Sequence, residues 1–504
     1  MQSGTLQTHQ SFWIASTLQS NYPALTTDLA VDVAIVGAGM AGITTAMLLK
    51  KAGKTVAVLE AGQVAEGASG HTTAKITSLH QLKYAGLIKS MGEAKAGVYG
   101  ASNQAAIEQM ATLVRDEQID CDFERKDAFT FAQDADTLEQ VKQEAEAAVR
   151  LGLPATFVTE TSLPFEVVGA VKFTQQAQFH PGKYLLSLAE KINGDGSFVF
   201  EQTRVCTVEE EALCRVKTDR GPTVTAQDVI ITTNLPILDQ GLYFAKTYPQ
   251  RSYLIGARID AAIAPNGMFI GTGEKYRSIR TTPMDNGETL LLMGGEGHKV
   301  GEADDTKERF ARLAADAATY FGVTSVDYYW SSQDFVSFDS VPYIGKLTPI
   351  NQHIYVATGF SLWGMTNSTV AAMLLADLVQ GRSNAWADLY DATRATPFVS
   401  TQSLKNNFDV GTHWVGDRLK GLFESPDTLA PDQGGLVTIN GEKVAAYRDE
   451  RGDLHKVSAI CPHLGCVVAW NAAEKSWDCP CHGSRFDTAG KVLHGPAVKT
   501  LEAK

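Results

Sequence analysis

The chain has 504 residues, which is room for two or three domains that bury their own cores without disulfide staples. Its 44% hydrophobic and 20% charged residues are ordinary for a soluble globular protein, and its net charge of −13 argues against nucleic acid or an anionic membrane as a partner. No apolar stretch approaches the roughly 20 residues of a membrane helix. At the N-terminus, residues 1–21 lack the basic and apolar regions of a secretory signal, so we expect a cytoplasmic location.

The first clear unit is a strand, a glycine-rich turn, a helix and a second strand. Residues 31–36 are apolar and β-branched, as in a buried parallel strand, and Gly37-Ala-Gly39-Met-Ala-Gly42 follows them directly. In such a turn the first glycine makes the tight bend, the second lets the backbone approach a pyrophosphate, and the third lets helix and strand pack closely. The helix N-terminus favours phosphate, and Glu60 at the end of the second strand is placed to bind a ribose hydroxyl. This unit predicts a dinucleotide site.

The middle of the chain alternates between helical and strand patterns. Residues 93–119 and 134–151 predict surface helices, and residues 353–359 predict a strand that leads into another helix. Residues 397–430 have weak periodicity and contain Pro397 and Pro426, with Pro431 directly after them, which predicts a linker. From Gly434 onwards, short β-type runs alternate with turn signals, which predicts a small all-β domain.

Four of the seven cysteines lie in the last 50 residues. Cys461 and His463 form a Cys-x-His pair, and fifteen residues later Cys479 and His482 form a Cys-x-x-His pair. Two thiolates and two imidazoles at this spacing can hold a [2Fe–2S] cluster, with both cysteines on one iron and both histidines on the other. A structural zinc site is the alternative, but the additional cysteine beside each pair speaks against it. The pattern therefore predicts one-electron transfer.

Residues 434–504 resemble the Rieske domain family, in particular its cytochrome bc-complex branch. The resemblance implies the same four ligands and a disulfide between Cys466 and Cys481 that ties the two cluster-binding loops together. A disulfide is unusual in the cytosol, and the sequence leaves open whether it forms. Ser484 matches a serine that donates a hydrogen bond to the cluster, whereas Phe486 stands where high-potential relatives have a tyrosine, so we expect a lower potential than theirs.

The glycine-rich unit alone does not distinguish NAD from FAD. Together with GASGHTTAKIT (67–77), DSVPYIG (339–345) and GFSLWGMTNS (359–368), it makes residues 30–395 resemble the D-amino-acid-oxidase-like family of FAD-dependent amine and amino-acid oxidoreductases. The resemblance implies an α/β FAD-binding Rossmann-type domain interleaved with an α+β substrate domain. No second dinucleotide fingerprint is present, which argues against an NADH-dependent reductase.

The same resemblance assigns residues to the flavin. In that family a glycine-rich turn before the last long helix closes over the isoalloxazine ring, and the helix dipole stabilises negative charge on the reduced ring; an ordinary strand–helix turn is the alternative. His71 lies where some relatives bind the flavin covalently through a histidine, and hydrogen bonding to pyrophosphate or capping of a turn are its alternatives. The positions assigned to FAD are Gly37, Gly39, Met40, Ala41, Gly42, Glu60, Ala61, Ser69, His71, Thr72, Val205, Gly359, Trp363, Gly364 and Met365.

The substrate site is less defined by the sequence. Tyr253 and Arg280 are the candidates, because relatives bind a substrate carboxylate through a tyrosine, an arginine or both, and the planar arginine fork matches a carboxylate. Surface salt bridges are the alternative role for such side chains. Catalysis need not use a strong base, since a neutral amine can deliver a hydride directly to the flavin.

We therefore expect residues 1–396 to form a FAD-dependent oxidoreductase, residues 397–430 a linker and residues 431–504 a Rieske domain. The expected activity is that of a dehydrogenase that oxidises a C–N bond of an amine or amino acid and passes electrons from FAD through the [2Fe–2S] cluster to an external one-electron acceptor. Two alternatives stay open: a ferredoxin-fed flavin reductase or monooxygenase with reversed electron flow, and a non-enzymatic redox sensor. The sequence does not identify the substrate, the acceptor or the oligomeric state.

Overall fold

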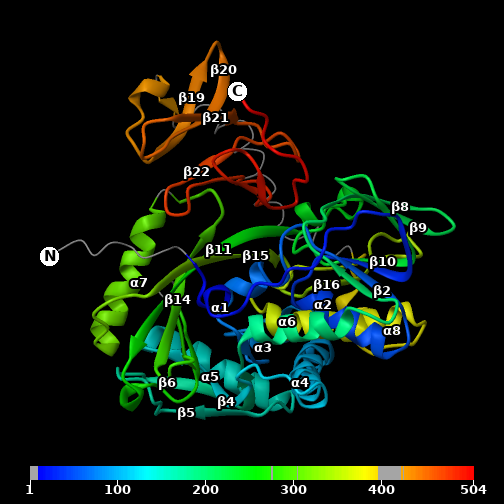
Figure 1. The fold of residues 1–504 in the computed structure, drawn as a ribbon. Coiled ribbons are helices and arrows are strands. Elements are labelled where there is room, and N and C mark those ends of the chain that lie inside the picture. The colour runs from blue at the N-terminus through cyan, green and yellow to red at the C-terminus, as the bar shows by residue number, and fades with distance from the viewer. Residues whose placement is uncertain (1–9, 274–275, 304, 395–421, 424) are drawn as a thin grey trace.

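The computed structural model describes residues 10–273, 276–303, 305–394, 422–423 and 425–504. These residues form one sheet of eight strands, one of nine strands and two of four strands each. The two large sheets lie in the N-terminal part of the chain, which we call the flavin module, and the two small sheets lie in the C-terminal part, which we call the Rieske module (Figure 1). This architecture matches the expected fold class.

The eight-stranded sheet has a parallel centre. Its strand β1 (Leu29–Val36) pairs in parallel with β2 (Val56–Leu59) on one side and with β10 (Thr223–Ile231) on the other. Every residue of β2 is buried, as expected for a strand that is covered on both faces. Helix α2 (Met40–Lys51) connects β1 to β2 and packs on α8 (Gly364–Val379). The remaining elements of this layer are α6 (Pro181–Ile192), β7 (Phe198–Phe200), β8 (Val205–Glu210), β9 (Cys214–Thr218), β16 (Tyr343–Lys346) and β17 (Ile354–Thr358).

The nine-stranded sheet is built on long antiparallel strands. Strand β11 (Thr247–Ile259) lies between β14 (Thr289–Lys299) and β15 (Tyr328–Ser337). Helix α7 (Thr306–Phe321) packs on β11 and β14. The remaining elements are β3 (Lys75–Ile76), α3 (Tyr84–Met91), α4 (Glu93–Asp116), β4 (Glu124–Ala132), α5 (Ala135–Arg150), β5 (Ala155–Val158), β6 (Gly169–Gln178), β12 (Met268–Gly271) and β13 (Arg277–Pro283). Helices α4 and α5 confirm the helices predicted in this region.

The two large sheets are interleaved along the chain. Residues 29–59, 198–231 and 343–358 supply the eight-stranded sheet, whereas residues 75–178 and 247–337 supply the nine-stranded sheet. A ligand between the two sheets therefore meets loops from several distant segments.

The Rieske module consists of two small antiparallel sheets. The first contains β18 (Leu422–Phe423), β19 (Gln433–Ile439), β20 (Glu442–Arg448) and β21 (Leu454–Ser458), and the second contains β22 (Ala469–Asn471), β23 (Ser476–Asp478), β24 (Arg485–Phe486) and β25 (Val492–His494). Only β18 pairs in parallel, with β19. Of the predicted linker, residues 397–421 and 424 lie outside the described residues.

Several short elements border the sites discussed below. They are α1 (Phe12–Ala15), the 3₁₀ helices η1 (Ala68–His71), η2 (Asp239–Gly241), η3 (Tyr243–Ala245), η4 (Ala261–Ile263) and η6 (Pro426–Thr428), and α9 (Ala387–Tyr390). Among the described residues, no helix combines the length and the apolar character that a membrane crossing requires.

Candidate flavin and iron–sulfur sites

The turn between β1 and α2 requires its glycines. Gly37 has a φ of +105°, and a Cβ there would lie 2.9 Å from the carbonyl oxygen of Thr232. A Cβ on Gly42 would lie 1.9 Å from the carbonyl oxygen of Gly37, so helix and turn could not approach each other as they do. Helix α2 begins at Met40, whose N–H donates to the Ser69 hydroxyl at 2.9 Å. The N-terminus of α2 is thus held against η1, with first-turn N–H groups available to a phosphate.

Glu60 braces this turn from the end of β2. One carboxylate oxygen accepts the N–H of Ala38 at 2.8 Å, and the other accepts the N–H of Gly62 at 2.8 Å. Burial raises the pKa of Glu60, while the two N–H bonds act in the opposite direction. The predicted ribose contact would use the lone pairs that these two bonds leave.

The loop before α8 is held in an unusual backbone conformation. Gly359, Ser361 and Leu362 have φ values of +74°, +55° and +70°, and non-glycine residues in this region are uncommon outside ligand and active sites. The N–H of Leu362 donates to the Asp334 carboxylate at 2.6 Å, and burial raises the pKa of Asp334 to about 6. Helix α8 then begins at Gly364 without a side-chain cap, so its N-terminus is open to the polar edge of a ligand.

The other predicted FAD positions lie near these two helix N-termini or along the strands beside them. His71 ends η1, accepts the indole N–H of Trp330 from β15 at 3.0 Å through its carbonyl, and pairs its Nδ1 with the Gly67 carbonyl at 2.9 Å. Trp363 stacks on His80 at 4.7 Å. Val205 begins β8 and is buried. Ala61 follows β2, Thr72 follows η1, and Met365 lies in the first turn of α8.

The two predicted substrate residues are not brought together. Tyr253 packs edge-on against Phe310 of α7, and its hydroxyl pairs with His298 at 2.9 Å. Arg280 lies on the other face of the sheet, where its Nη1 donates to the Ala74 carbonyl at 2.8 Å and its guanidinium covers the Trp13 ring. Burial lowers the pKa of Arg280 to about 9. Both residues stay substrate candidates by prediction, but they cannot share one pocket.

Sequence reasoning missed Lys75, which lies on the Arg280 side of this sheet. Its Nζ donates to the Phe269 carbonyl at 2.5 Å and to the Ser278 hydroxyl at 2.6 Å. Burial, and then the nearby Arg280, hold its pKa well below the ordinary value. The signal that could have found it is its position at the end of the loop 67–77.

The four predicted cluster ligands converge in the Rieske module. Cys461 and Cys479 are buried free thiols within hydrogen-bond reach of each other. The imidazole rings of His463 and His482 lie 5.0 Å apart, and both Nδ1 atoms are buried without a partner in the described part of the chain. Buried nitrogens of this kind are rare in proteins unless they bind something. Two orphaned imidazole nitrogens beside two thiols are the donor set of a [2Fe–2S] cluster.

The loops that carry these ligands are tied together. Cys466 and Cys481 form the predicted disulfide, with Cα atoms 6.5 Å apart. The sulfurs of these two residues lie within 4.8 Å of the Cys479 sulfur, which the disulfide leaves free as a ligand. The Ser484 hydroxyl reaches Cys461 and also accepts the N–H of Ala497 at 3.0 Å. Phe486 is fully buried and lies across the sheet from Trp477.

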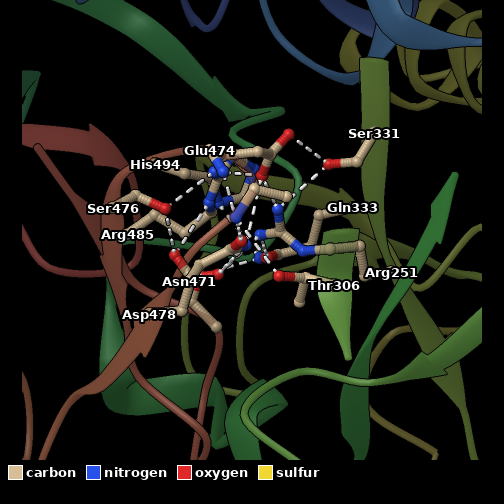
Figure 2. Close-up of polar contacts among 12 residues, drawn as sticks. Arg251, Thr306, Ser331, Gln333, Asn471, Glu474, Ser476, Asp478, Arg485 and His494 are labelled. Carbon is tan, nitrogen blue, oxygen red and sulfur yellow. Dashed lines mark hydrogen bonds and ion pairs between the residues drawn. The ribbon is translucent and has the colours of Figure 1, made fainter. Parts of the chain in front are cut away.

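The Rieske module is fastened to the flavin module by a buried group of four charges, which we call the charge cluster: Arg251, Glu474, Asp478 and Arg485 (Figure 2). Arg251 comes from β11 and is only 1% exposed; it contacts Glu474 and lies 3.2 Å from the Asp478 carboxylate. Burial on its own would raise the pKa of Asp478, but the two arginines hold it well below the ordinary value. The cluster is electrically balanced, with two charges of each sign.

Neutral groups of β15 extend this contact. The Ser331 hydroxyl donates to Glu474 at 2.6 Å (Figure 2). The Gln333 amide donates to the Gly483 carbonyl at 2.7 Å. A Cβ on Gly483 would lie 2.6 Å from the Gln333 Nε2, so the cluster-binding loop approaches β15 as closely as a glycine allows. His494, from the end of β25, stacks on Phe335 with 6.2 Å between ring centroids.

The histidine edge of the cluster site, His463 and His482, faces the flavin module as well. The Nε2 of His463 lies 3.0 Å from the Asp239 carboxylate in η2. Phe244 of η3 packs edge-on against both rings, at 5.8 and 5.1 Å. Sequence reasoning did not identify Asp239, Phe244 or the charge cluster, because nothing local in the chain relates them to the ligands.

Comparison with known proteins decides the family. Residues 32–378 match the sequence model of the FAD dependent oxidoreductase family. The chain belongs to the FAD dependent oxidoreductase family. Residues 423–503 match the Rieske [2Fe-2S] domain. This FAD dependent oxidoreductase is therefore an enzyme whose cofactors are FAD and a [2Fe–2S] cluster, as expected from the sequence.

Individual relatives cover one or both modules of this FAD dependent oxidoreductase. It is 37% identical over 499 residues to the putative Rieske 2Fe-2S iron-sulfur protein YhfW of Bacillus subtilis, which spans 98% of this chain and 97% of that protein. It is 25% identical over 404 residues to gamma-glutamylputrescine oxidoreductase of Escherichia coli, which spans 76% and 92%. Among solved structures, glycine oxidase from Geobacillus kaustophilus shares the fold, with a TM-score of 0.62 over 73% of this chain and 99% of that chain at 19% identity.

Proposed function

We propose that this enzyme is a dehydrogenase that oxidises a C–N bond of an amine or amino acid and sends the electrons, through the iron–sulfur site, to an external one-electron acceptor. FAD supplies the two-electron chemistry and a [2Fe–2S] cluster carries one electron at a time. Each substrate would lose one hydride equivalent and one proton to become an imine, and two acceptor molecules would each gain one electron. Water then hydrolyses the imine.

One observation carries the proposal: a packed path joins the two sites within a single chain. His494, beside the cluster-binding loops, stacks on Phe335. The carbonyl of Phe335 accepts the N–H of Ser361 at 3.0 Å, and Ser361 belongs to the loop that leads into α8. Phe335 of β15 thus contacts both the Rieske module and the loop assigned to the flavin ring, and this short path supports electron transfer between the two cofactors.

The residues of the flavin module would divide the work of holding FAD. The turn from Gly37 to Gly42 and the N-terminus of α2 would bind the pyrophosphate. The N-terminus of α8 at Gly364 would face the pyrimidine edge of the ring, where its dipole stabilises negative charge after reduction. His71 would lie between these two ends of the cofactor, where a covalent bond to the flavin and a hydrogen bond to it are both compatible with its place at the end of η1.

The substrate class is proposed from similarity and from charge. The relationship to gamma-glutamylputrescine oxidoreductase favours an amine. Arg280 and Lys75 lie on one face of the nine-stranded sheet, and burial lowers the pKa of both; Arg280, with a pKa of about 9, keeps its positive charge at neutral pH. Positive charge near the substrate disfavours a protonated amine, so the enzyme would bind the neutral amine, the form that can deliver a hydride.

Anaerobic mixing with a panel of secondary amines and amino acids tests the proposal. The flavin absorbance should bleach first and the iron–sulfur absorbance second, at the expense of the same substrate. Reduction only by a reduced ferredoxin, with no response to any amine, would overturn the proposed direction of electron flow. An enzyme reduced by substrate at the flavin alone would contradict the role of the cluster.

A further inference from the structure

The histidine edge of the cluster site, His463 and His482, is covered in this chain by its own flavin module. The His463 side chain and the whole residue His482 are each only 6% exposed. Two short elements of the flavin module, η2 with Asp239 and η3 with Phe244, cover them. The histidine edge is thus an internal contact between modules.

The direction of the Asp239 hydrogen bond follows from the ligand chemistry. The Nδ1 of His463 is buried without a partner among the described residues, which leaves it to bind iron. An imidazole nitrogen that binds a metal carries no proton, so the proton is on Nε2 and points at the Asp239 carboxylate 3.0 Å away. His463 therefore donates to Asp239.

We propose that Asp239 is a positioning residue for the cluster: its carboxylate orients the His463 ring, increases electron donation to the iron and so lowers the potential of the cluster. Carboxylate partners of metal-bound histidines act in this way in general, by fixing the ring and raising ligand basicity. The partner here comes from the other module, 224 residues away in sequence. This inference rests on the proposed function only in treating the flavin module as the electron donor.

The module contact does not depend on Asp239. Its carboxylate is 48% exposed, whereas the charge cluster holds the modules together through four buried or half-buried groups. A variant at Asp239 should therefore leave the modules docked and change the cluster alone. This separation makes the proposal testable in the full-length holoenzyme.

In electron transfer, the cluster held by His463 would take one electron from reduced flavin and pass it to the external acceptor. A second such transfer would return the flavin to its oxidised state with release of its proton. By lowering the potential of the cluster, Asp239 decreases the driving force of the first transfer and increases that of the second. Asp239 thus favours electron transfer from the cluster to the acceptor over retention of the electron on the cluster.

The test compares Asp239→Ala and Asp239→Asn with the parent holoenzyme, in a redox titration with a chemical reductant and mediators followed by electron paramagnetic resonance. Asp239→Ala should raise the equilibrium constant for reduction of the cluster about tenfold. This corresponds to a midpoint potential that is higher by about 59 mV for a one-electron couple. Asp239→Asn keeps a hydrogen-bond acceptor without the charge and should shift the potential less, in the same direction. The spectrum of the reduced cluster should change in both variants.

Two control variants keep the test specific. Gln240→Ala changes the exposed neighbour in η2, and Asp388→Asn removes an 89% exposed charge from α9, which packs on β16 and α4. Neither should move the potential or the spectrum. A potential and spectrum unchanged in both Asp239 variants would overturn the inference. The redox titration uses a chemical reductant and needs no substrate. It therefore tests the role of Asp239 even if no amine reduces the enzyme and the proposed function is wrong.

Discussion

Two of the contacts between the Rieske module and the flavin module differ in kind. The charge cluster around Arg251 is buried, has two charges of each sign and is held by several ion pairs. The histidine edge, in contrast, is contacted by one half-exposed carboxylate, Asp239, and one aromatic ring, Phe244. Removing a partner from a buried charge group costs far more than removing an exposed one. The difference indicates that the first contact holds the modules in place and the second adjusts the cluster.

The largest effect should come from Arg251→Met. The substitution leaves Glu474 and Asp478 with Arg485 as their main cationic partner, and breaking a buried ion pair in this way costs about 3–5 kcal/mol. Denaturant unfolding followed by the absorbance of both cofactors measures the loss. Arg258→Met is the matched control, since Arg258 lies in the same strand with a side chain 51% exposed and should cost less than about 1 kcal/mol. Equal losses in the two variants would contradict the role of the charge cluster in holding the modules together.

Asp334 should depend on pH in the opposite direction to the acids of the charge cluster, because it is a buried acid with no cationic partner among the described residues. Burial raises its pKa to about 6, above the unfolded value, so its contribution to stability is present below about pH 4 and is lost as the pH rises through 6. Asp334→Asn keeps the acceptor for the Leu362 N–H and should remove this dependence, which amounts to about 2–3 kcal/mol. The free energy of unfolding of the holoenzyme between pH 4 and pH 7 checks it. A variant with an unchanged pH profile would show that Asp334 is not the titrating group.

The charge cluster should respond to pH with the reverse sign. The pKa values of Asp478 and Glu474 are lowered by the two arginines, although burial alone would raise them. Their contribution is therefore complete above the ordinary carboxyl range, near pH 4, and is lost as the pH falls through the lowered values. Each carboxylate should add a slope of up to about 1.4 kcal/mol per pH unit to the free energy of unfolding. The free energy of unfolding should depend less steeply on pH in Arg251→Met than in the parent enzyme. An equal slope in the two proteins would contradict the role of the arginines.

The smallest effect should come from Phe486→Tyr, inside the Rieske module. Phe486 is fully buried beside the cluster site and has no hydroxyl, so a tyrosine would add a hydrogen-bond donor. The added donor should raise the cluster potential, with an increase of about tenfold or less in the equilibrium constant for reduction. Ser484→Ala, which removes an existing donor near Cys461, should lower the potential. Redox titration measures both shifts. A potential that does not move in Phe486→Tyr would contradict the expectation of a tuned, low-potential centre.

The parts of the sites that are local in sequence were predictable. Gly37 and Gly42 follow from a turn that excludes any Cβ, and the four cluster ligands follow from spacing within two adjoining loops. The loop before α8 was identified by resemblance, and its left-handed residues Ser361 and Leu362 agree with a ligand-binding turn.

Contacts created by docking were not predictable. Arg251 and Glu474 are 223 residues apart, and no periodicity in either segment indicates that they meet. Tyr253 and Arg280 illustrate a second limit. Side chains alternate along β13, so Ser278 and Arg280 lie on one face of it. Both faces of the nine-stranded sheet are buried, however, so polarity does not reveal which face meets a ligand.

The burial of Arg251 has a consequence for how this chain can be divided. A fragment that stops before the Rieske module would carry a guanidinium, 1% exposed in the whole molecule, on a freshly opened surface without its acids. The stacked face of Phe335 and the free amide of Gln333 would be opened beside it. Truncation would thus expose an apolar ring beside an unpaired guanidinium, and we expect the shortened protein to aggregate more readily than the whole chain.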